Sequence, residues 1–185
     1  MGKKLLIIIF VVFFITSCGD DTEVITSSWL ETLETEKLSI EIPSNWKILE
    51  NTEDILPKIK QGKIELAVAS EDIVNGFSNN LLILSDDLDS FTTSKDFSML
   101  NNVWASADYL DYTKLESKEF IFTDEEVSII YIFEAKYNLD TPKLKFLQTA
   151  HVCNQTDAFF LTLALPTSIQ DTSKYESFLK TFKCK

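Results

Sequence analysis

The chain has 185 residues, with 29 acidic and 17 basic side chains and a formal net charge of −12 at pH 7. An acidic chain of this kind is not expected to bind nucleic acid, whose phosphates require a basic surface. All 17 basic residues are lysines and only 4 residues are glycine, which leaves neither arginine forks nor a glycine-rich phosphate loop.

The first seventeen residues have the pattern of an export signal. Lys3 and Lys4 precede an apolar block at residues 5–15, and Thr16 and Ser17 follow it. A helix over this block would cover only about 17 Å, roughly half of a bilayer core, which is too short for a transmembrane span. The alternative is a buried first element of the folded domain, but a lysine pair is unfavourable beside a core element.

The sequence Ile15-Thr16-Ser17-Cys18 resembles the lipobox of bacterial lipoproteins. This resemblance implies that residues 1–17 are a lipoprotein signal peptide and that Cys18 is diacylated as the mature N-terminus. Two acyl chains are enough for stable membrane anchoring. Residues 18–28 would then be the lipidated cysteine with a polar tether, and residues 29–185 a single domain. The expected location is the bacterial cell envelope, on the periplasmic side or on the outer surface of the outer membrane.

The first part of the domain is predicted to form strands. Apolar and polar residues alternate in short runs, with a turn at Glu34–Lys37 and an interruption at Pro43. The predicted strands are 29–35, 38–43, 46–49, 63–70 and 80–85. The strand at 80–85 is apolar enough to be central in a sheet.

A helix is predicted at about 94–109. Thr93 and Asp96 have the spacing of a capping box at its start. Apolar residues then recur with helical spacing and are predicted to form the buried face of this helix. They are Phe97, Leu100, Trp104 and Ala107.

The second half is predicted to form four strands in meander order and a closing helix. Polar turns at 123–126, 138–142 and 154–157 separate the strands, which are 112–122, 127–137, 143–153 and 158–165. Ser173 and Glu176 have capping-box spacing at the start of the last helix. Its predicted buried face is Tyr175, Phe178, Leu179 and Phe182.

Strands in sequence with segregated helices predict an α+β fold. The runs 127–133 and 159–165 are apolar at consecutive positions, so both faces of their sheet have to be covered. We therefore expect an antiparallel sheet of about six or more strands, flanked by helices on its two sides.

The segment Leu38-Ser-Ile-Glu-Ile-Pro-Ser-Asn-Trp46 resembles the opening of the PsbP-like family, named for an extrinsic protein of photosystem II. The resemblance continues at 79–83, in the middle helix, and at 158–164 and 175–183, and it covers about residues 27–184. It implies a PsbP-like α/β/α sandwich, shared with the envelope lipoproteins DcrB and LpqN and with a Ran-binding nuclear import factor. Members of this fold mostly bind or help to assemble other proteins, and no common catalytic set carries over. The cysteine pair and the absence of arginine depart from the family.

Cys153 and Cys184 are predicted to form a disulfide. Cys153 ends a strand, and the last helix returns toward the same end of the sheet. On an ideal helix, position 184 lies opposite the apolar face, so the helix has to unwind near Lys183. Two separate thiols are the alternative, but export favours oxidation. A metal site is not expected, because a structural zinc site has four protein ligands and the sequence offers only the two cysteines and His151.

Other candidate residues have a structural and a functional interpretation. His151 could be a general base, but no motif places a serine or an acid beside it, and a structural role is favoured. The acidic stretch 86–89 is interpreted as a turn rather than a calcium loop, because it lacks the EF-hand glycine and glutamate. Trp29, Trp46 and Trp104 could line a ligand pocket, but are predicted to be core residues.

The sequence thus predicts a lipid-anchored, non-catalytic envelope domain that binds or assists another envelope protein. The membrane contact is expected through the lipid on Cys18, and no cofactor, catalytic residue or nucleic acid partner is expected. The alternative is a small-ligand-binding lipoprotein with a pocket between sheet and helix near Trp104. A hydrolase would require a pocket that gathers His151 with a serine, aspartate or glutamate.

Overall fold

The computed structural model describes residues 29–50, 62–74 and 76–185 of the chain. The predicted signal peptide, Cys18 and the tether lie outside these residues. In chain order the elements are β1 (Leu30–Glu34), β2 (Leu38–Pro43), β3 (Trp46–Ile48), β4 (Lys63–Val74), β5 (Phe77–Asp87), α1 (Ser94–Asp108), β6 (Leu110–Ile121), β7 (Val127–Lys136), β8 (Leu144–Cys153), β9 (Asp157–Pro166), α2 (Ser173–Leu179) and β10 (Lys183–Cys184).

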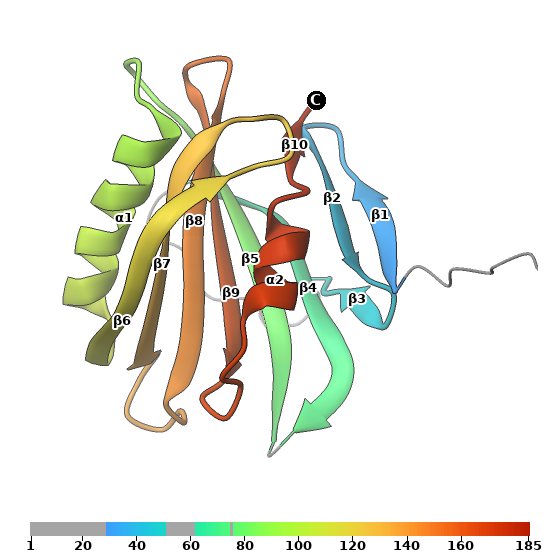
Figure 1. Ribbon diagram of the computed structural model, residues 1–185, viewed down its shortest axis with the longest axis vertical. Coiled ribbons are helices and arrows are strands. Elements are labelled where there is room, and N and C mark those ends of the chain that lie inside the picture. The colour runs from blue at the N-terminus through green and yellow to red at the C-terminus, as the bar shows by residue number, and fades with distance from the viewer. Residues whose placement is uncertain (1–28, 51–61, 75) are drawn as a thin grey trace, which may run out of the picture.

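The described residues form a seven-stranded antiparallel sheet and a smaller three-stranded one (Figure 1). The large sheet has the strand order β3-β4-β5-β9-β8-β7-β6, and the small sheet has the order β1-β2-β10. The predicted meander β6 to β9 is confirmed, as is the central place of β5, which pairs with β4 and with β9. The predicted α+β fold is therefore confirmed, with β1 and β2 in a separate sheet that the sequence did not indicate.

Both faces of the large sheet are covered. α1 lies on one face, while α2 and the small sheet lie on the other (Figure 1). Beneath α1 the sheet presents several alanines, which let the helix approach closely: Ala135, Ala150, Ala158 and Ala164. The opposite face forms the larger apolar core with α2 and the small sheet, and it includes Leu38, Ile40, Ile42, Leu81, Ile83, Leu147, Leu161, Leu163, Phe178 and Phe182.

The helix α1 begins where the sequence predicts. The Thr93 hydroxyl accepts a hydrogen bond from the Asp96 amide at 3.0 Å and donates one to the Asp96 carboxylate at 2.7 Å. Of the predicted buried face only Phe97 is buried, and the prediction is wrong for Leu100, Trp104 and Ala107, which are exposed. The buried residues of α1 are Ser94, Phe97, Ser98 and Ala105.

The buried serines of α1 are held by hydrogen bonds to β7, β8 and the turn before β7. The pairing of β7 with β8 runs from Ala135 and Leu144 to Tyr131 and Gln148. Beyond it, the Ser94 hydroxyl accepts from the Val152 amide at 2.7 Å and donates to the Glu126 carboxylate at 2.5 Å. The Ser98 hydroxyl donates to a β7 carbonyl at 2.7 Å. These side chains supply partners to groups that burial would otherwise leave unsatisfied.

The helix α2 is shorter than predicted and begins differently. Its N-cap residue is Thr172, whose side chain makes no capping hydrogen bond, so the predicted capping box of Ser173 and Glu176 is wrong. Hydrogen bonds from the Ser173 hydroxyl and amide lower the pKa of Asp171 just before the helix. The predicted apolar face is buried, although its last member, Phe182, lies beyond the helix end at Leu179.

The C-terminal segment is attached to both sheets. β10 pairs with β2, with Cys184 opposite Leu38, and the disulfide Cys153–Cys184 joins it to the end of β8. The Cα atoms of the two cysteines are 6.0 Å apart. On a continuous helix, Cys184 would point away from the apolar face and from Cys153. α2 ends at Leu179, so Cys184 lies in a strand and can reach Cys153. The predicted disulfide is present.

We expect Ser94→Ala to destabilise the domain by about 1–3 kcal/mol, because the Val152 amide would lose its acceptor in a partly buried position. Urea denaturation would measure this change in the free energy of unfolding. Ser106→Ala is the matched control on the same helix, since Ser106 is exposed and bonds only within the helix. It should change stability by less than about 0.5 kcal/mol. Equal effects of the two substitutions would contradict the role given to Ser94.

Replacing Cys153 and Cys184 together by alanine should lower the free energy of unfolding by roughly 3–4 kcal/mol. The disulfide spans 31 residues of sequence, and its loss frees a loop of that length in the unfolded chain. Denaturation of the double variant and of the oxidised protein tests this value. Mass spectrometry without reduction is the accompanying check, and two free thiols in the native protein would refute the disulfide.

Candidate functional site

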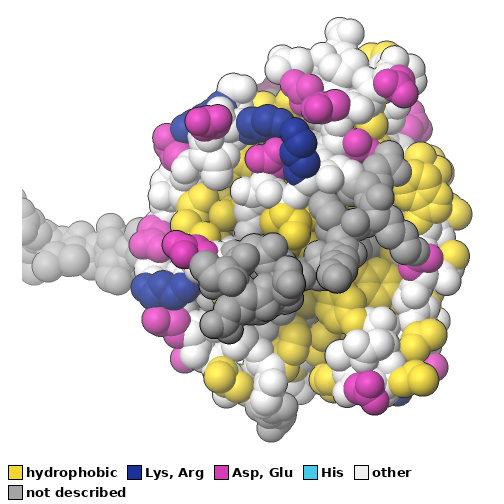
Figure 2. All heavy atoms as spheres, turned by 180° about the vertical axis from the view of Figure 1, so that it is seen from behind, with side chains coloured by type: hydrophobic (Ala, Val, Ile, Leu, Met, Phe, Trp, Pro, Cys, Tyr) yellow, Lys and Arg dark blue, Asp and Glu magenta, His cyan; other side chains and the backbone are white. Residues whose placement is uncertain are grey.

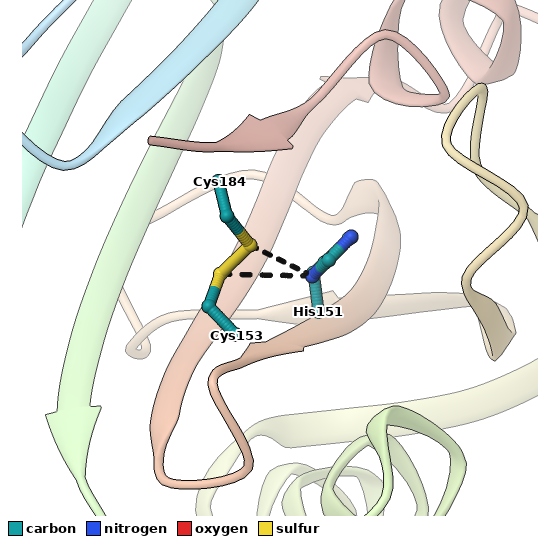
Figure 3. A group of neighbouring side chains, drawn as sticks. All are labelled: His151, Cys153 and Cys184. Atoms are coloured by element: carbon teal, nitrogen blue, oxygen red, sulfur yellow. Dashed lines mark hydrogen bonds between the residues drawn. A yellow bond between two sulfur atoms is a disulfide. The ribbon is translucent and has the colours of Figure 1, made fainter.

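The strongest cluster of reactive side chains lies at the end of β8, beside the disulfide. The His151 side chain points toward the bond between Cys153 and Cys184 (Figure 3). Its Nδ1 atom lies 3.4 Å from the Cys184 sulfur and 3.8 Å from the Cys153 sulfur. Its Nε2 atom lies 2.9 Å from a carboxylate oxygen of Asp124. One imidazole thus links a carboxylate to a disulfide.

Three parts of the chain bring these residues together. β8 carries His151 and Cys153 two positions apart, so both point to the same face of the sheet. β10 carries Cys184, and the turn between β6 and β7 carries Asp124. That turn is fixed by a hydrogen bond from the Thr123 amide to the Lys180 carbonyl, at 2.8 Å.

The imidazole of His151 is enclosed by aromatic rings. Its centroid lies 4.7 Å from the Phe122 ring and 5.2 Å from the Phe182 ring. The side chain is only 5% exposed, whereas that of Asp124 is 32% exposed. A carboxylate only accepts hydrogen bonds, so Nε2 is the nitrogen that donates to Asp124. The neutral form of the ring with its proton on Nε2 has its lone pair on Nδ1, the nitrogen that faces the sulfurs.

The sequence did not place an acid beside His151, and the structure corrects this. Asp124 was predicted only as part of a hairpin turn, which it is, and no motif connects two residues that are 27 positions apart in the sequence. A histidine with an aspartate partner resembles part of a catalytic triad. At the other ring nitrogen, however, the neighbours are two disulfide sulfurs instead of a hydroxyl nucleophile.

A second candidate is the solvent-facing side of α1, which we call the α1 outer face. It consists of Met99, Leu100, Val103 and Trp104, whose exposed fractions are 44%, 46%, 59% and 47%. Figure 2 shows hydrophobic side chains at the surface on the side of the molecule where α1 lies. Adjacent exposed apolar side chains of this kind typically mark a binding surface.

The three tryptophans differ in their surroundings. Trp46 is buried against Phe178, as predicted for a core residue. The prediction is wrong for Trp29 and Trp104, which are each 47% exposed. Trp104 belongs to a helix face that the sheet does not cover.

The structure has a shallow depression of about 240 Å³ away from Trp104. It lies between the small sheet, the β6–β7 turn and the C-terminal segment. This volume is below that of typical small-ligand pockets, about 300–1,000 Å³. The lining residues are Thr32, Ser39, Glu41, Thr123, Thr181 and Lys183.

The acidic stretch 86–89 begins within a strand. Asp86 and Asp87 are the last residues of β5 and pair with Ala158 and Asp157, and Asp89 follows in the turn toward α1. In the ranges that the structure describes, no helix is both long enough and apolar enough to cross a membrane.

Comparisons with known proteins identify the fold. A scan against protein-family models and a search of curated proteins each found no match. Among solved structures, the cyanobacterial PsbP protein CyanoP from Synechocystis matches with a TM-score of 0.56 and 14% identity, over 92% of this chain and 99% of that one. A Pseudomonas aeruginosa protein of unknown function matches with a TM-score of 0.50 and 10% identity, over 82% and 91%. The yeast Ran-binding protein Mog1p matches with a TM-score of 0.49 and 6% identity, over 83% and 94%. The chain has the PsbP-like α+β fold that the sequence predicted.

Proposed function

We propose that the chain is a lipid-anchored, non-catalytic domain of the bacterial cell envelope that binds another envelope protein through the α1 outer face. The observation that supports this proposal most strongly is the exposure of Leu100, Val103 and Trp104 on one side of α1. The similarity to CyanoP supports the fold on which this surface is carried.

The α1 outer face is better suited to binding than to folding. Its side chains lie outside both core regions, so they contribute little to the stability of the free domain. Burying them against a partner would contribute about 25 cal/mol for each Å² of apolar surface removed from water. Trp104 is the expected anchor, because tryptophan is enriched among the residues that dominate binding energy.

The charge of the chain indicates the chemistry of the partner. The formal net charge is −12, and acidic residues flank the outer face at Asp96 and Asp108, in the first and last turns of α1. Figure 2 shows more acidic than basic side chains on the face that it presents. A partner with an apolar patch surrounded by lysine or arginine would be complementary, and this arrangement would speed association.

The N-terminal sequence supports a position close to a membrane. A lipid on Cys18 would be followed by only ten residues, most of them polar, before the domain. Fully extended, ten residues reach at most about 35 Å. The domain would therefore begin within this distance of the bilayer, which favours a membrane protein or another anchored protein as the partner.

Trp104→Ala should weaken binding of the partner by about 10- to 30-fold, as expected for the loss of an aromatic anchor of about 1.4–2 kcal/mol. The measurement is recovery of the partner from gently solubilised membranes with immobilised wild-type and variant chains. Because Trp104 is exposed, the midpoint temperature of thermal unfolding should remain nearly unchanged.

The control for this experiment is Ile73→Ala, which removes another exposed apolar side chain, on β4. It should leave recovery unchanged, and recovery by the wild type should fall as salt concentration rises. If the Trp104→Ala and Ile73→Ala variants recover the partner equally well, binding at the α1 outer face is contradicted.

Cys18→Ser should release a folded protein from the membrane, because acylation at this cysteine is the proposed anchor. Fractionation of cells into membrane and soluble parts, followed by circular dichroism of the released chain, tests this expectation. Cys184→Ala also removes a sulfur but should stay with the membranes. A Cys18→Ser protein that remains bound after a high-salt wash would rule out lipid as its main attachment.

A further inference from the structure

We propose that Cys153 and Cys184, once their disulfide is reduced, form with His151 a binding site for a thiophilic cation such as Zn²⁺. The ligand atoms of the three residues all lie within 4.8 Å of one another. His151 and Cys153 are buried and Cys184 is half-buried, so the site is enclosed on the side of the core and reachable near the C-terminus.

The positions of these atoms fit tetrahedral coordination. With Zn–S bonds of about 2.3 Å and Zn–N bonds of about 2.0 Å, a tetrahedral ion separates nitrogen from sulfur by about 3.5 Å. The two observed distances from His151 Nδ1 to sulfur are 3.4 and 3.8 Å. Only the two sulfurs would have to move apart, from a bond of about 2 Å to about 3.8 Å.

The orientation of His151 gives independent support. Asp124 accepts the hydrogen bond from Nε2, which leaves Nδ1 as the nitrogen available for a cation. Histidine ligands of metals usually donate their other N–H to a carboxylate in this way, which fixes the ring and raises its basicity. The rings of Phe122 and Phe182 would supply the apolar surroundings.

Reduction requires a dithiol, either a small molecule or a protein with two neighbouring thiols. Thiol–disulfide exchange transfers two electrons and two protons from the dithiol, which becomes a disulfide, and the bond between Cys153 and Cys184 breaks to give two thiols. Each thiol loses its proton on binding the cation, so two protons are released. Exchange with a disulfide oxidant, which takes up the two electrons and becomes two thiols, would re-form the bond between Cys153 and Cys184, remove two of the three ligands and release the ion.

The ligand set favours Zn²⁺ or Cu⁺ over Mg²⁺ or Ca²⁺, because thiolates are soft ligands and imidazole suits zinc and copper, whereas Mg²⁺ and Ca²⁺ prefer oxygen ligands. Three protein ligands leave one tetrahedral position for water, an arrangement known from zinc sites that keep an open position. This also resolves the missing fourth ligand, which counted against a metal site at the level of the sequence.

The test uses the full-length chain in detergent, reduced with a dithiol, desalted without oxygen and titrated with Zn²⁺ against a chromophoric chelator. The reduced chain should bind one Zn²⁺, and the oxidised chain and the Cys153→Ala/Cys184→Ala variant should bind none. Co²⁺ in place of Zn²⁺ should give the absorption of thiolate-to-metal charge transfer. Zinc should also slow alkylation of the two thiols.

Asp124→Asn should lower the Zn²⁺ affinity about 10- to 100-fold by weakening the orientation of His151. Glu125→Gln, at the next and exposed position of the same turn, is the matched control and should have no effect. His151→Gln should lower the affinity further than Asp124→Asn. Equal affinity in the Asp124→Asn and Glu125→Gln variants, or unchanged affinity in His151→Gln, would overturn the proposal.

The folded state of the reduced chain is followed by circular dichroism during the titration. If reduction loosens the structure, Zn²⁺ should restore it, because binding to the folded site adds to its stability. A reduced chain that unfolds and is not restored by zinc would overturn the proposal, as would zinc binding no tighter than in the double alanine variant.

Discussion

Both faces of β8 are buried, and this constraint determines how the rest of the domain is arranged. Every residue from Leu144 to Cys153 is buried except Val152, which is partly exposed. A strand of this kind needs a layer on each side, because its backbone is already paired within the sheet and its side chains point both ways. α1 supplies one layer, and α2 with the small sheet supplies the other. The C-terminus is consequently drawn across the end of β8, where β10 and the disulfide fix it.

Local sequence patterns predicted most helices and strands, but they did not predict every pairing between strands. The turns after residues 122 and 153 and the apolar runs between them were enough to predict the meander. The separate sheet of β1, β2 and β10 was not predictable, since the choice of partner strand depends on packing between distant segments. The buried face of α1 was misassigned for a related reason. Hydrophobic periodicity cannot recognise Ser94 and Ser98 as buried, because their burial depends on hydrogen bonds to β7, β8 and Glu126.

The candidate site was predictable only where chemistry limited the choices. Once Cys18 was assigned to the lipid, Cys153 and Cys184 were the only cysteines left to pair. The contact between His151 and Asp124 spans 27 residues and two strands, and it arises because the β6–β7 turn folds over the end of β8. No spacing rule describes that contact.

Two features of the domain run against the usual distribution of residues, and both coincide with a proposed binding site. On α1, small polar side chains are buried while Trp104 and its neighbours face solvent. At the end of β8, a polar imidazole lies between two phenylalanine rings, although burying it requires a partner to offset the loss of water. An apolar side chain would fill that space without such a requirement, and buried charged or polar pairs are weak evidence for stability alone. Deviations from the consistent pattern of a stable fold are expected where function imposes them, which favours a role for His151 and for the α1 outer face beyond folding.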